Sequence, residues 1–289
     1  MNSDGMENRQ IVNQAPDTSE KDRLEAFILL SKKIRKSILN LIYNTKSPHI
    51  GPSFSVVEIL VSLYFKTLRV FPENPFNPDR DRFILSKGHA CPALYAVLAE
   101  RSFIGEDDLE GFAVNNGILE QHPNIDLNKG IEVSTGSLGH GLSIGTGMAL
   151  AGKVDKKQYR VYVLLSDGEL NEGSVWEAIM FAGHHKLSNL IAFVDYNKIQ
   201  ALGCTRDIID LEPLGEKWKS FGWNVQEIDG HNFEQIFTAL NSLSLEKPNV
   251  ILLHTVKGKG VSFMENNLLW HYRAPDDKEY KLALKELMK

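Results

Sequence analysis

The sequence predicts an α/β fold in which helices cover both faces of a parallel sheet. Short runs of β-branched and apolar residues, such as "VYVLLS" at 161–166 and "LIAFVD" at 190–195, indicate strands that are buried on both faces. Segments with helical spacing of apolar residues separate these runs along the chain. Strands that alternate with helices build βαβ units, whose strands run parallel.

The predicted elements follow one another in a regular order. A first helix is expected at residues 23–45 and a second at 55–68, after the Pro- and Gly-containing segment "SPHIGPS". Strands are expected at 81–86, 159–166, 189–195, 223–229 and 249–256, and further helices within 87–102, 134–153 and 232–243. Crossovers between parallel strands are right-handed, so the carboxyl ends of the strands line one edge, where ligands bind.

Composition limits the kinds of partner that the chain can have. The formal net charge is −5 and no Lys/Arg run is long, so no nucleic-acid partner is expected. The two cysteines form no C-x-x-C pair, which excludes a disulfide framework or a zinc site and fits a reducing compartment. No apolar run is long enough to span a membrane.

The first residues differ in composition from the rest. Residues 1–22 are polar and contain no apolar segment of the signal-peptide kind. We expect them to form a disordered tail, followed by one α/β domain over residues 23–289. The expected location is cytoplasmic.

Two polar side chains follow neighbouring strands of the predicted sheet. Asp167 comes directly after the run at 161–166, and Asn197 follows the run at 190–195. Either residue alone is typical of an ordinary turn. Together they predict a magnesium site, with the backbone carbonyl of Ile199 as a third oxygen ligand and phosphate oxygens completing the shell. Gly168 lets the backbone approach a phosphate, and the helix that opens near Glu172 directs its amides at the anion.

These residues carry a family resemblance. The segment "SDGELNEGSVWEA…LSNLIAFVDYNKIQ" resembles the thiamine-diphosphate motif of transketolases, with Ser166 in place of the usual first Gly. The segments "NTKSPHIGPSFSVVEIL", "DRFILSKGHACPALYAVLAE", "QHPN", "STGSLGHGLSIGTGMAL" and "HTVKGKGVSFMEN…WHYRAP" follow in the order of that family. The resemblance covers residues 23–275. It implies a thiamine-diphosphate-binding fold, specifically the domain that holds the diphosphate and Mg²⁺.

The resemblance also implies roles for histidines in Gly/Pro-flanked loops. His89 would contact the cofactor diphosphate near the thiazolium, and His271 would lie beside the diphosphate and the substrate oxygens. His49 and His122 would bind the hydroxyls of a donor ketose and move protons, which imidazole can do near neutral pH. His231, in the turn "DGHN", is expected at the surface.

Other positions are assigned in the same way. Gly136, Leu138, Gly168 and Asn197 would contact the cofactor, and Glu172 would be buried near it. Lys257 and Lys259 flank a glycine in "KGKG", for which a solvated turn is favoured over a phosphate site.

The resemblance implies a partner chain. Transketolases activate the cofactor with a glutamate on a second domain, and the present sequence ends at Lys289, soon after its last matching motif. We therefore expect a second subunit that carries the pyrimidine-binding and C-terminal transketolase domains, in an α2β2 complex. The complex would transfer a two-carbon ketol unit from a ketose or ketose phosphate to an aldose.

Three alternatives remain open at this point. The first is the alpha-type subunit of a 2-oxo-acid dehydrogenase, which has the same magnesium motif but does not account for "SKGHA" and "WHYRAP". The second is a subunit of an acyloin or sugar-branching synthase that also uses thiamine diphosphate. The third is a paralogue that binds the cofactor as a scaffold without catalysis.

Overall fold

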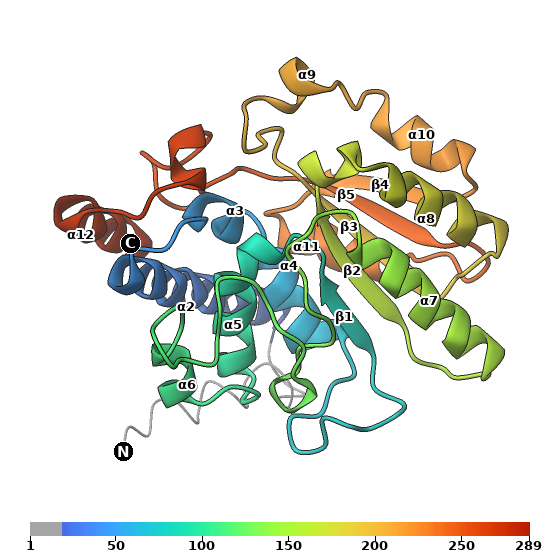
Figure 1. Ribbon diagram of the computed structural model, residues 1–289, viewed down its shortest axis with the longest axis horizontal. Helices are drawn as coiled ribbons and strands as arrows, with labels where there is room; N and C mark the ends of the chain where they lie inside the picture. The colour runs from blue at the N-terminus through green and yellow to red at the C-terminus, as the bar shows by residue number, and fades with distance from the viewer. Residues whose placement is uncertain (1–18) are drawn as a thin grey trace.

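A five-stranded parallel sheet forms the centre of the molecule. The computed structural model describes residues 19–289, and its strand order is β1-β2-β3-β5-β4 (Figure 1). The strands are β1 (Arg82–Leu85), β2 (Val161–Ser166), β3 (Leu190–Tyr196), β4 (Asn224–Asp229) and β5 (Asn249–His254). Every neighbouring pair is parallel, and the ends of each strand agree with those of a predicted run to within two residues.

Helices connect these strands. The longer helices are α2 (Glu20–Thr45), α5 (Cys91–Glu100), α7 (Gly141–Val154), α8 (Gly173–His184), α11 (Phe233–Asn241) and α12 (Asp277–Leu287). The shorter ones are α3 (Ile50–Phe54), α4 (Val57–Ser62), α6 (Glu106–Glu110), α9 (Thr205–Ile208) and α10 (Leu214–Ser220). Single turns of 3-10 helix occur at η2 (Gly88–Ala90), η3 (Leu127–Lys129), η4 (Gly168–Asn171) and η5 (Leu268–His271).

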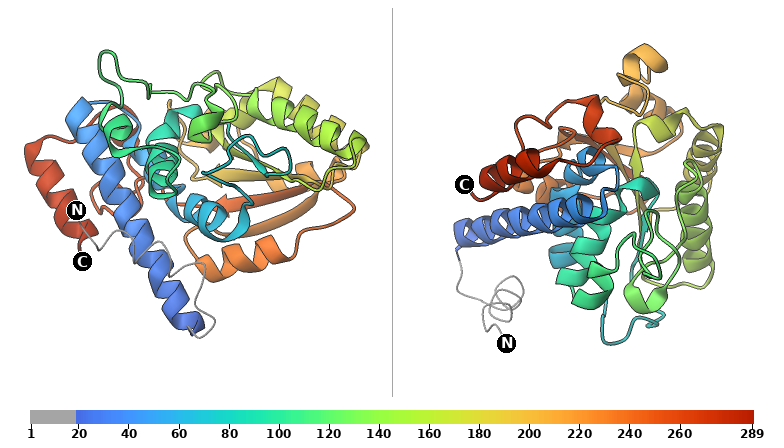
Figure 2. Two further views of the ribbon diagram at one scale, coloured as in Figure 1. Left: turned by 90° about the horizontal axis from the view of Figure 1, so that it is seen from below. Right: turned by 60° about the vertical axis from the view of Figure 1, so that its left-hand side comes forward.

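Side chains of the sheet alternate between two apolar cores. In β2, Tyr162 and Leu164 join one core, whereas Val161, Val163 and Leu165 join the other. Helices α2, α4, α5 and α11 enclose the first core, and α7, α8 and α10 cover the second. The left panel of Figure 2 shows the sheet between these two layers, with α2 beside α12. The predicted sandwich of helices around a parallel sheet is therefore confirmed.

Two predicted boundaries need adjustment. The second helix is divided, because α4 passes at Leu63 into a π-helical turn, η1 (Leu63–Thr67). Residues 1–18 of the predicted tail lie outside the described residues, whereas residues 20–22 form the first turn of α2, where Ser19 and Asp22 make a capping box. Within residues 19–289, no helix is both long and apolar enough to cross a membrane.

A buried ion pair joins helices α2 and α4. The guanidinium of Arg35 donates from Nη1 and Nη2 to the two carboxylate oxygens of Glu58, at 2.7 and 2.8 Å, and from Nε to the carbonyl of Lys259 at 2.9 Å. His231 accepts a hydrogen bond at Nε2 from the backbone N–H of Val256, so its proton lies on Nδ1 and is donated to Glu58 at 2.9 Å. The expected surface position of His231 is wrong, since its side chain is only 10% exposed.

Replacing Arg35 with Met should leave the carboxylate of Glu58 buried without its cation. We expect the free energy of unfolding at pH 7 to fall by about 3–5 kcal/mol in urea titrations. The matched control is Lys33→Met on the same helix, where the lysine is 51% exposed and pairs with Glu100. That control should change stability by less than ~0.5 kcal/mol, and equal losses in the two variants would contradict the prediction.

The same pair gives a pH dependence. Burial raises the pKa of Glu58, but the attraction of Arg35 and the hydrogen bond from His231 outweigh it and lower the pKa to about 2. A carboxyl whose pKa is depressed on folding stabilises the protein above its unfolded pKa, and this contribution is lost as the pH falls towards 2. The difference in unfolding free energy between the wild type and Arg35→Met, measured in urea at several pH values, should accordingly shrink as the pH falls from 7 towards 2.

Candidate active site

The carboxyl ends of β2, β3 and β5 meet at one edge of the sheet. Ser166 pairs with Asp195 in register, and Tyr196 pairs with His254. The residues that follow these strands, among them Asp167 and Asn197, therefore emerge side by side. The sequence prediction that both side chains lie at this edge is in agreement with the strand register.

Asp195, the penultimate residue of β3, is a hub of buried hydrogen bonds. Its Oδ2 accepts from the ammonium of Lys87, from the hydroxyl of Ser55 at 2.7 Å and from Nδ2 of Asn197 at 2.9 Å. Its Oδ1 accepts from the hydroxyl of Thr255. Burial raises the pKa of Asp195, but the cation of Lys87 and these hydrogen bonds outweigh that effect, so the pKa is lowered.

Asp167 is buried beside this hub. Its carboxylate accepts hydrogen bonds from the backbone N–H groups of Gly168 at 2.7 Å and Lys198 at 2.6 Å, and from the hydroxyl of Thr205 at 3.3 Å. Asp167 forms no ion pair with any residue in the described range 19–289. Burial and the neighbouring charge of Asp195 raise the pKa of Asp167 to about 6. The site thus contains a buried carboxylate that a cation would stabilise.

The two other predicted metal ligands lie next to it. The amide oxygen of Asn197 accepts from the N–H of Ile199 at 3.0 Å, and the N–H of Lys198 contacts Asp167, which brings the three residues together. The carbonyl of Ile199 accepts from the ammonium of Lys257 at 2.8 Å. All three predicted ligand oxygens therefore belong to one small region.

Lys257 is a site residue that the sequence analysis missed. The favoured interpretation as part of a solvated turn is wrong, because Lys257 is 1% exposed and its ammonium donates to Ile199 and to Nδ1 of His271 at 2.9 Å. Burial, with repulsion from Lys87, lowers the pKa of Lys257 to about 8. The pattern "KGKG" alone does not distinguish a buried lysine from an exposed one, whereas its position directly after β5 indicates the sheet edge.

The four predicted catalytic histidines form one cluster. The ring of His49 lies 5.3 Å from that of His89, 6.2 Å from that of His122 and 5.2 Å from that of His271, between centroids. The rings of His89 and His271 are 5.5 Å apart. Histidines from four separate segments of the sequence thus lie together.

Backbone contacts hold this cluster. His49 has a φ of 77°, a left-handed conformation that is uncommon for a residue with a side chain, and its N–H donates to the carbonyl of His271 at 3.0 Å. Because Nδ1 of His271 accepts from Lys257, the proton of the neutral ring lies on Nε2. This N–H group remains available to donate to an oxygen of a ligand.

His49, His89 and His271 are neutral at pH 7. Burial lowers the pKa of His49 to about 4 and that of His271 to about 3, with further repulsion from neighbouring histidines and lysines. Burial and Lys87 hold the pKa of His89 well below its usual value. Neutral imidazoles can each donate at one nitrogen and accept at the other, as proton transfer between sugar oxygens requires.

The glycine-containing loop before α7 borders the same cluster. Gly136 lies against the ring of His122, and Leu138 is half-buried two residues further on. Glu169 fastens this loop, because its carboxylate accepts from the N–H of Gly139 at 2.9 Å and from the hydroxyl of Ser86. The buried carboxylate of Glu169 therefore links the loop before α7 to the end of β1.

Glu172 does not have its expected environment. The expectation of a buried side chain is wrong, because Glu172 is exposed in the chain described here. It nevertheless adjoins the same loop, since a Cβ on Gly139 would lie 2.7 Å from the Cβ of Glu172. The turn between η4 and α8 places residue 172 outside the chain's own core.

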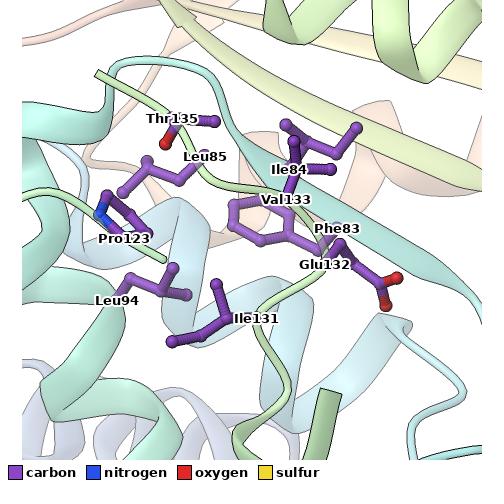
Figure 3. A pocket seen from close by; sticks show the side chains of 9 residues that line it. All are labelled: Phe83, Ile84, Leu85, Leu94, Pro123, Ile131, Glu132, Val133 and Thr135. Carbon is purple, nitrogen blue, oxygen red and sulfur yellow. The ribbon is translucent and has the colours of Figure 1, made fainter. Parts of the chain in front are cut away.

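The segment after β1 and the loop before α7 approach each other closely at Gly88, next to His89. A Cβ on Gly88 would lie 2.7 Å from Oγ1 of Thr135, 2.8 Å from its carbonyl carbon and 2.9 Å from the nitrogen of Gly136. Figure 3 shows the small, mainly apolar cavity on which this loop rests, and Thr135, at its rim, has a buried hydroxyl without a hydrogen-bond partner. Only glycine permits this contact between the two segments.

Comparison with known proteins identifies the family. The family model described as "Transketolase, thiamine diphosphate binding domain" matches residues 29–287. The chain belongs to the transketolase family. It is 42% identical to one subunit of the apulose-4-phosphate transketolase of Phocaeicola vulgatus, over 92% of this chain and 95% of that protein. It is 45% identical to one subunit of the 6-deoxy-6-sulfo-D-fructose transketolase of a Clostridium species, over 89% of this chain and 94% of that one.

Full-length transketolases match in the same region. The chain is 38% identical to human transketolase over 87% of its own length but only 40% of the human protein. Among solved structures, the transketolase of Campylobacter jejuni superposes with a TM-score of 0.84 at 29% identity, over 90% of this chain and 43% of that one. The chain thus spans less than half of these full-length enzymes.

These findings confirm the predicted family and fold. The chain corresponds to the diphosphate-binding subunit of a split transketolase, because relatives that match it over almost their whole length are named as transketolase subunits. They favour this interpretation over a 2-oxo-acid dehydrogenase subunit.

Gly88→Ala should disturb the contact between the loops. Part of the Thr135 side chain can turn away, but the backbone atoms at 2.8 and 2.9 Å cannot, so the loop at 135–136 has to move. We expect a loss of about 1–3 kcal/mol in the free energy of unfolding, measured in urea. The matched control is Gly147→Ala in α7, where a Cβ would meet nothing within 4 Å. That variant should be as stable as the wild type or slightly more stable, and the same loss in both would contradict the explanation.

Proposed function

We propose that this chain binds thiamine diphosphate and Mg²⁺ and supplies one half of the active site of a two-chain transketolase. The observation that carries the proposal is the clustering of four histidines beside Asp167, Asn197 and Lys257 at the carboxyl edge of the sheet. The complex would transfer a two-carbon ketol unit from a ketose to an aldose.

The residues at the site fit a metal ion with a diphosphate. Asp167 is a buried carboxylate beside a second one, Asp195, and it lacks a cationic partner within residues 19–289. Mg²⁺ prefers oxygen ligands and uses few protein carboxylates, which suits Asp167, Asn197 and the carbonyl of Ile199. The described residues contain no group of three or more His, Cys, Asp or Glu that could hold a metal alone, so phosphate oxygens would have to complete the shell.

Positive charge at the same edge favours the anion. The ammonium of Lys257 lies between Ile199 and His271, and its lowered pKa is consistent with a cation that lacks a full countercharge. A diphosphate placed there would supply that charge. Gly168 and the amides of η4 follow directly after Asp167, where a phosphate can approach the backbone.

Thiamine diphosphate, when bound, supplies the electron sink needed to break the carbon–carbon bond beside the donor carbonyl. We assign His89 and His271 to the diphosphate side, where the Nε2 proton of His271 donates to an oxygen. His49 and His122 would bind the donor hydroxyls and move the proton of the hydroxyl that becomes a carbonyl. Gly136 and Leu138 would pack against the cofactor, and Glu172 would face it or the partner chain.

A second subunit completes this proposal. The buried carboxylates at the site already accept hydrogen bonds on the diphosphate side; they are Asp167, Glu169 and Asp195. We therefore place the glutamate that activates the aminopyrimidine on a partner that carries the pyrimidine-binding and C-terminal domains. We expect an α2β2 complex with an interface in the obligate range, above ~2,000 Å². The cytoplasmic location stays a prediction.

The substrates are expected to be sugars or sugar phosphates. Two relatives of similar length are named for apulose 4-phosphate and for 6-deoxy-6-sulfo-D-fructose, both compounds with an anionic group remote from the reacting end. The histidines of this chain would grip the end of the donor that carries the ketol unit. Groups that recognise the remote anion would lie on the partner chain.

The proposal predicts that the purified chain alone has no transketolase activity. Ketol transfer from a ketose phosphate to an aldose should appear on co-expression with the partner chain, with affinity for thiamine diphosphate rising because both ends of the cofactor are then held. Activity assays, calorimetric titration of the cofactor with Mg²⁺ and native mass measurement test this. Turnover by the chain alone at the rate of the complex would refute the divided active site.

A second prediction concerns the metal. Asp167→Ala should abolish Mg²⁺-dependent binding of thiamine diphosphate without unfolding the protein, because the diphosphate then lacks its bridging cation. Asp207→Ala, which removes an exposed carboxylate in the first turn of α9, is the matched control and should bind normally. Wild-type affinity in Asp167→Ala, measured by calorimetry, would show that the metal site has been misassigned.

A further inference from the structure

An amide is an ambiguous metal ligand, because only one of its two ends can bind a cation. The side chain of Asn197 can turn so that either its oxygen or its nitrogen faces the place of the ion. A site that depends on this oxygen therefore needs a second group that fixes the orientation of the amide. Such partners of metal ligands contribute strongly to affinity in other metal sites.

The structure contains a residue in the right place for this task. Nδ2 of Asn197 donates to Oδ2 of Asp195 at 2.9 Å, and a carboxylate can only accept a hydrogen bond. At the other end, Oδ1 of Asn197 accepts from the N–H of Ile199 at 3.0 Å and retains a second lone pair. Turning the amide over would place its oxygen against the carboxylate of Asp195, where both groups are acceptors. It would also place its NH₂ group against the N–H of Ile199, where both groups are donors.

Asp195 is itself fixed from several directions. Its carboxylate is completely buried and accepts from Lys87, at the end of β1, from Ser55, after α3, and from Thr255, after β5. The ammonium of Lys87 also donates to the carbonyl of Pro52 at 3.1 Å. Separate segments of the chain thus converge on one side chain that touches Asn197 but is not one of the predicted ligands.

We propose that Asp195 is a positioning residue that sets the amide of Asn197 with its oxygen towards the metal, and that Lys87, Ser55 and Thr255 hold Asp195 for this purpose. The inference rests on the proposed function, since it concerns the same metal site. It adds a residue whose effect on the metal passes through another side chain.

The decisive variants are Asp195→Asn and the exchange Asp195→Asn/Asn197→Asp. Asparagine at 195 can donate as well as accept, so it no longer opposes the turned orientation of the amide at 197, and only the N–H of Ile199 still does. In the exchanged variant, a carboxylate at 197 offers an oxygen at either end, so its orientation no longer matters, and the number of carboxylates in the pair is unchanged. A double-mutant comparison separates this role from general stabilisation.

Metal binding is measured with Mn²⁺ in the presence of thiamine diphosphate, from the electron paramagnetic resonance signal of free Mn²⁺, on the full chain with its partner subunit. We expect Asp195→Asn to bind Mn²⁺ at least about tenfold more weakly, equivalent to ~1.4 kcal/mol. The exchanged variant should recover most of the affinity. Melting temperatures are recorded in parallel. A purely structural role of Asp195 would lower the melting temperature of both variants, and the exchanged variant would not recover its affinity for Mn²⁺.

A milder pair of variants covers the case in which Asp195→Asn does not fold. Ser55→Ala removes one hydrogen bond to Asp195, whereas Ser53→Ala, in the same segment, removes a bond to the carbonyl of His49 and leaves Asp195 untouched. We expect weaker Mn²⁺ binding in Ser55→Ala and unchanged binding in Ser53→Ala.

Each outcome can be assigned. Any of three results would overturn the positioning role: unchanged Mn²⁺ affinity in Asp195→Asn, no recovery of affinity in the exchanged variant, or equal affinities in the two serine variants. The proposed function would still stand in that case, provided that the wild type binds Mn²⁺ and Asp167→Ala does not. A wild-type complex that fails to bind Mn²⁺ with thiamine diphosphate would overturn the proposed function, and the inference with it.

Discussion

The parallel pairing of β2 with β3 is the constraint on which the rest of the site depends. Their register sets Ser166 opposite Asp195, so the chain leaves the two strands at the same level. Asp167 and Asn197 are then neighbours although they are thirty positions apart in the sequence. A slip of one residue would move Asp195 and Asn197 together to the other face of the sheet and replace the polar edge with apolar side chains. The apolar cores on both faces make such a slip costly.

Those cores also compensate for the polar groups that the site buries. Lys87 and Asp195 are both fully buried, and removing two charges from water offsets much of their attraction. The cost is reduced because Asp195 accepts several hydrogen bonds besides that of Lys87. The arrangement is better explained as a means of fixing geometry than as a source of stability.

Much of this organisation could be predicted from the sequence, because strands buried on both faces are continuous apolar runs and the site residues follow them directly. The apolar runs predict all five strands, whereas the shared site of His49, His89, His122 and His271 is implied by the resemblance to transketolases. The burial of polar residues in turns could not be predicted. Lys257 and His231 lie in segments that look solvated in isolation, and their burial depends on distant residues such as Glu58 and His271, whose packing is a tertiary property. Glu172 shows the opposite outcome, because its side chain is expected to be buried but is exposed at the turn before α8.

The two outer strands determine how the sheet can meet other molecules. β4 is one edge strand and carries exposed carboxylates at Glu227 and Asp229. β1, the other edge strand, has only four residues. Short edge strands and exposed charged side chains on an edge strand disfavour the addition of a strand from another chain. Assembly through a continuous intermolecular sheet is therefore disfavoured on both sides, and any protein that joins this one must do so through helices and loops, which leaves the register of the central strands undisturbed.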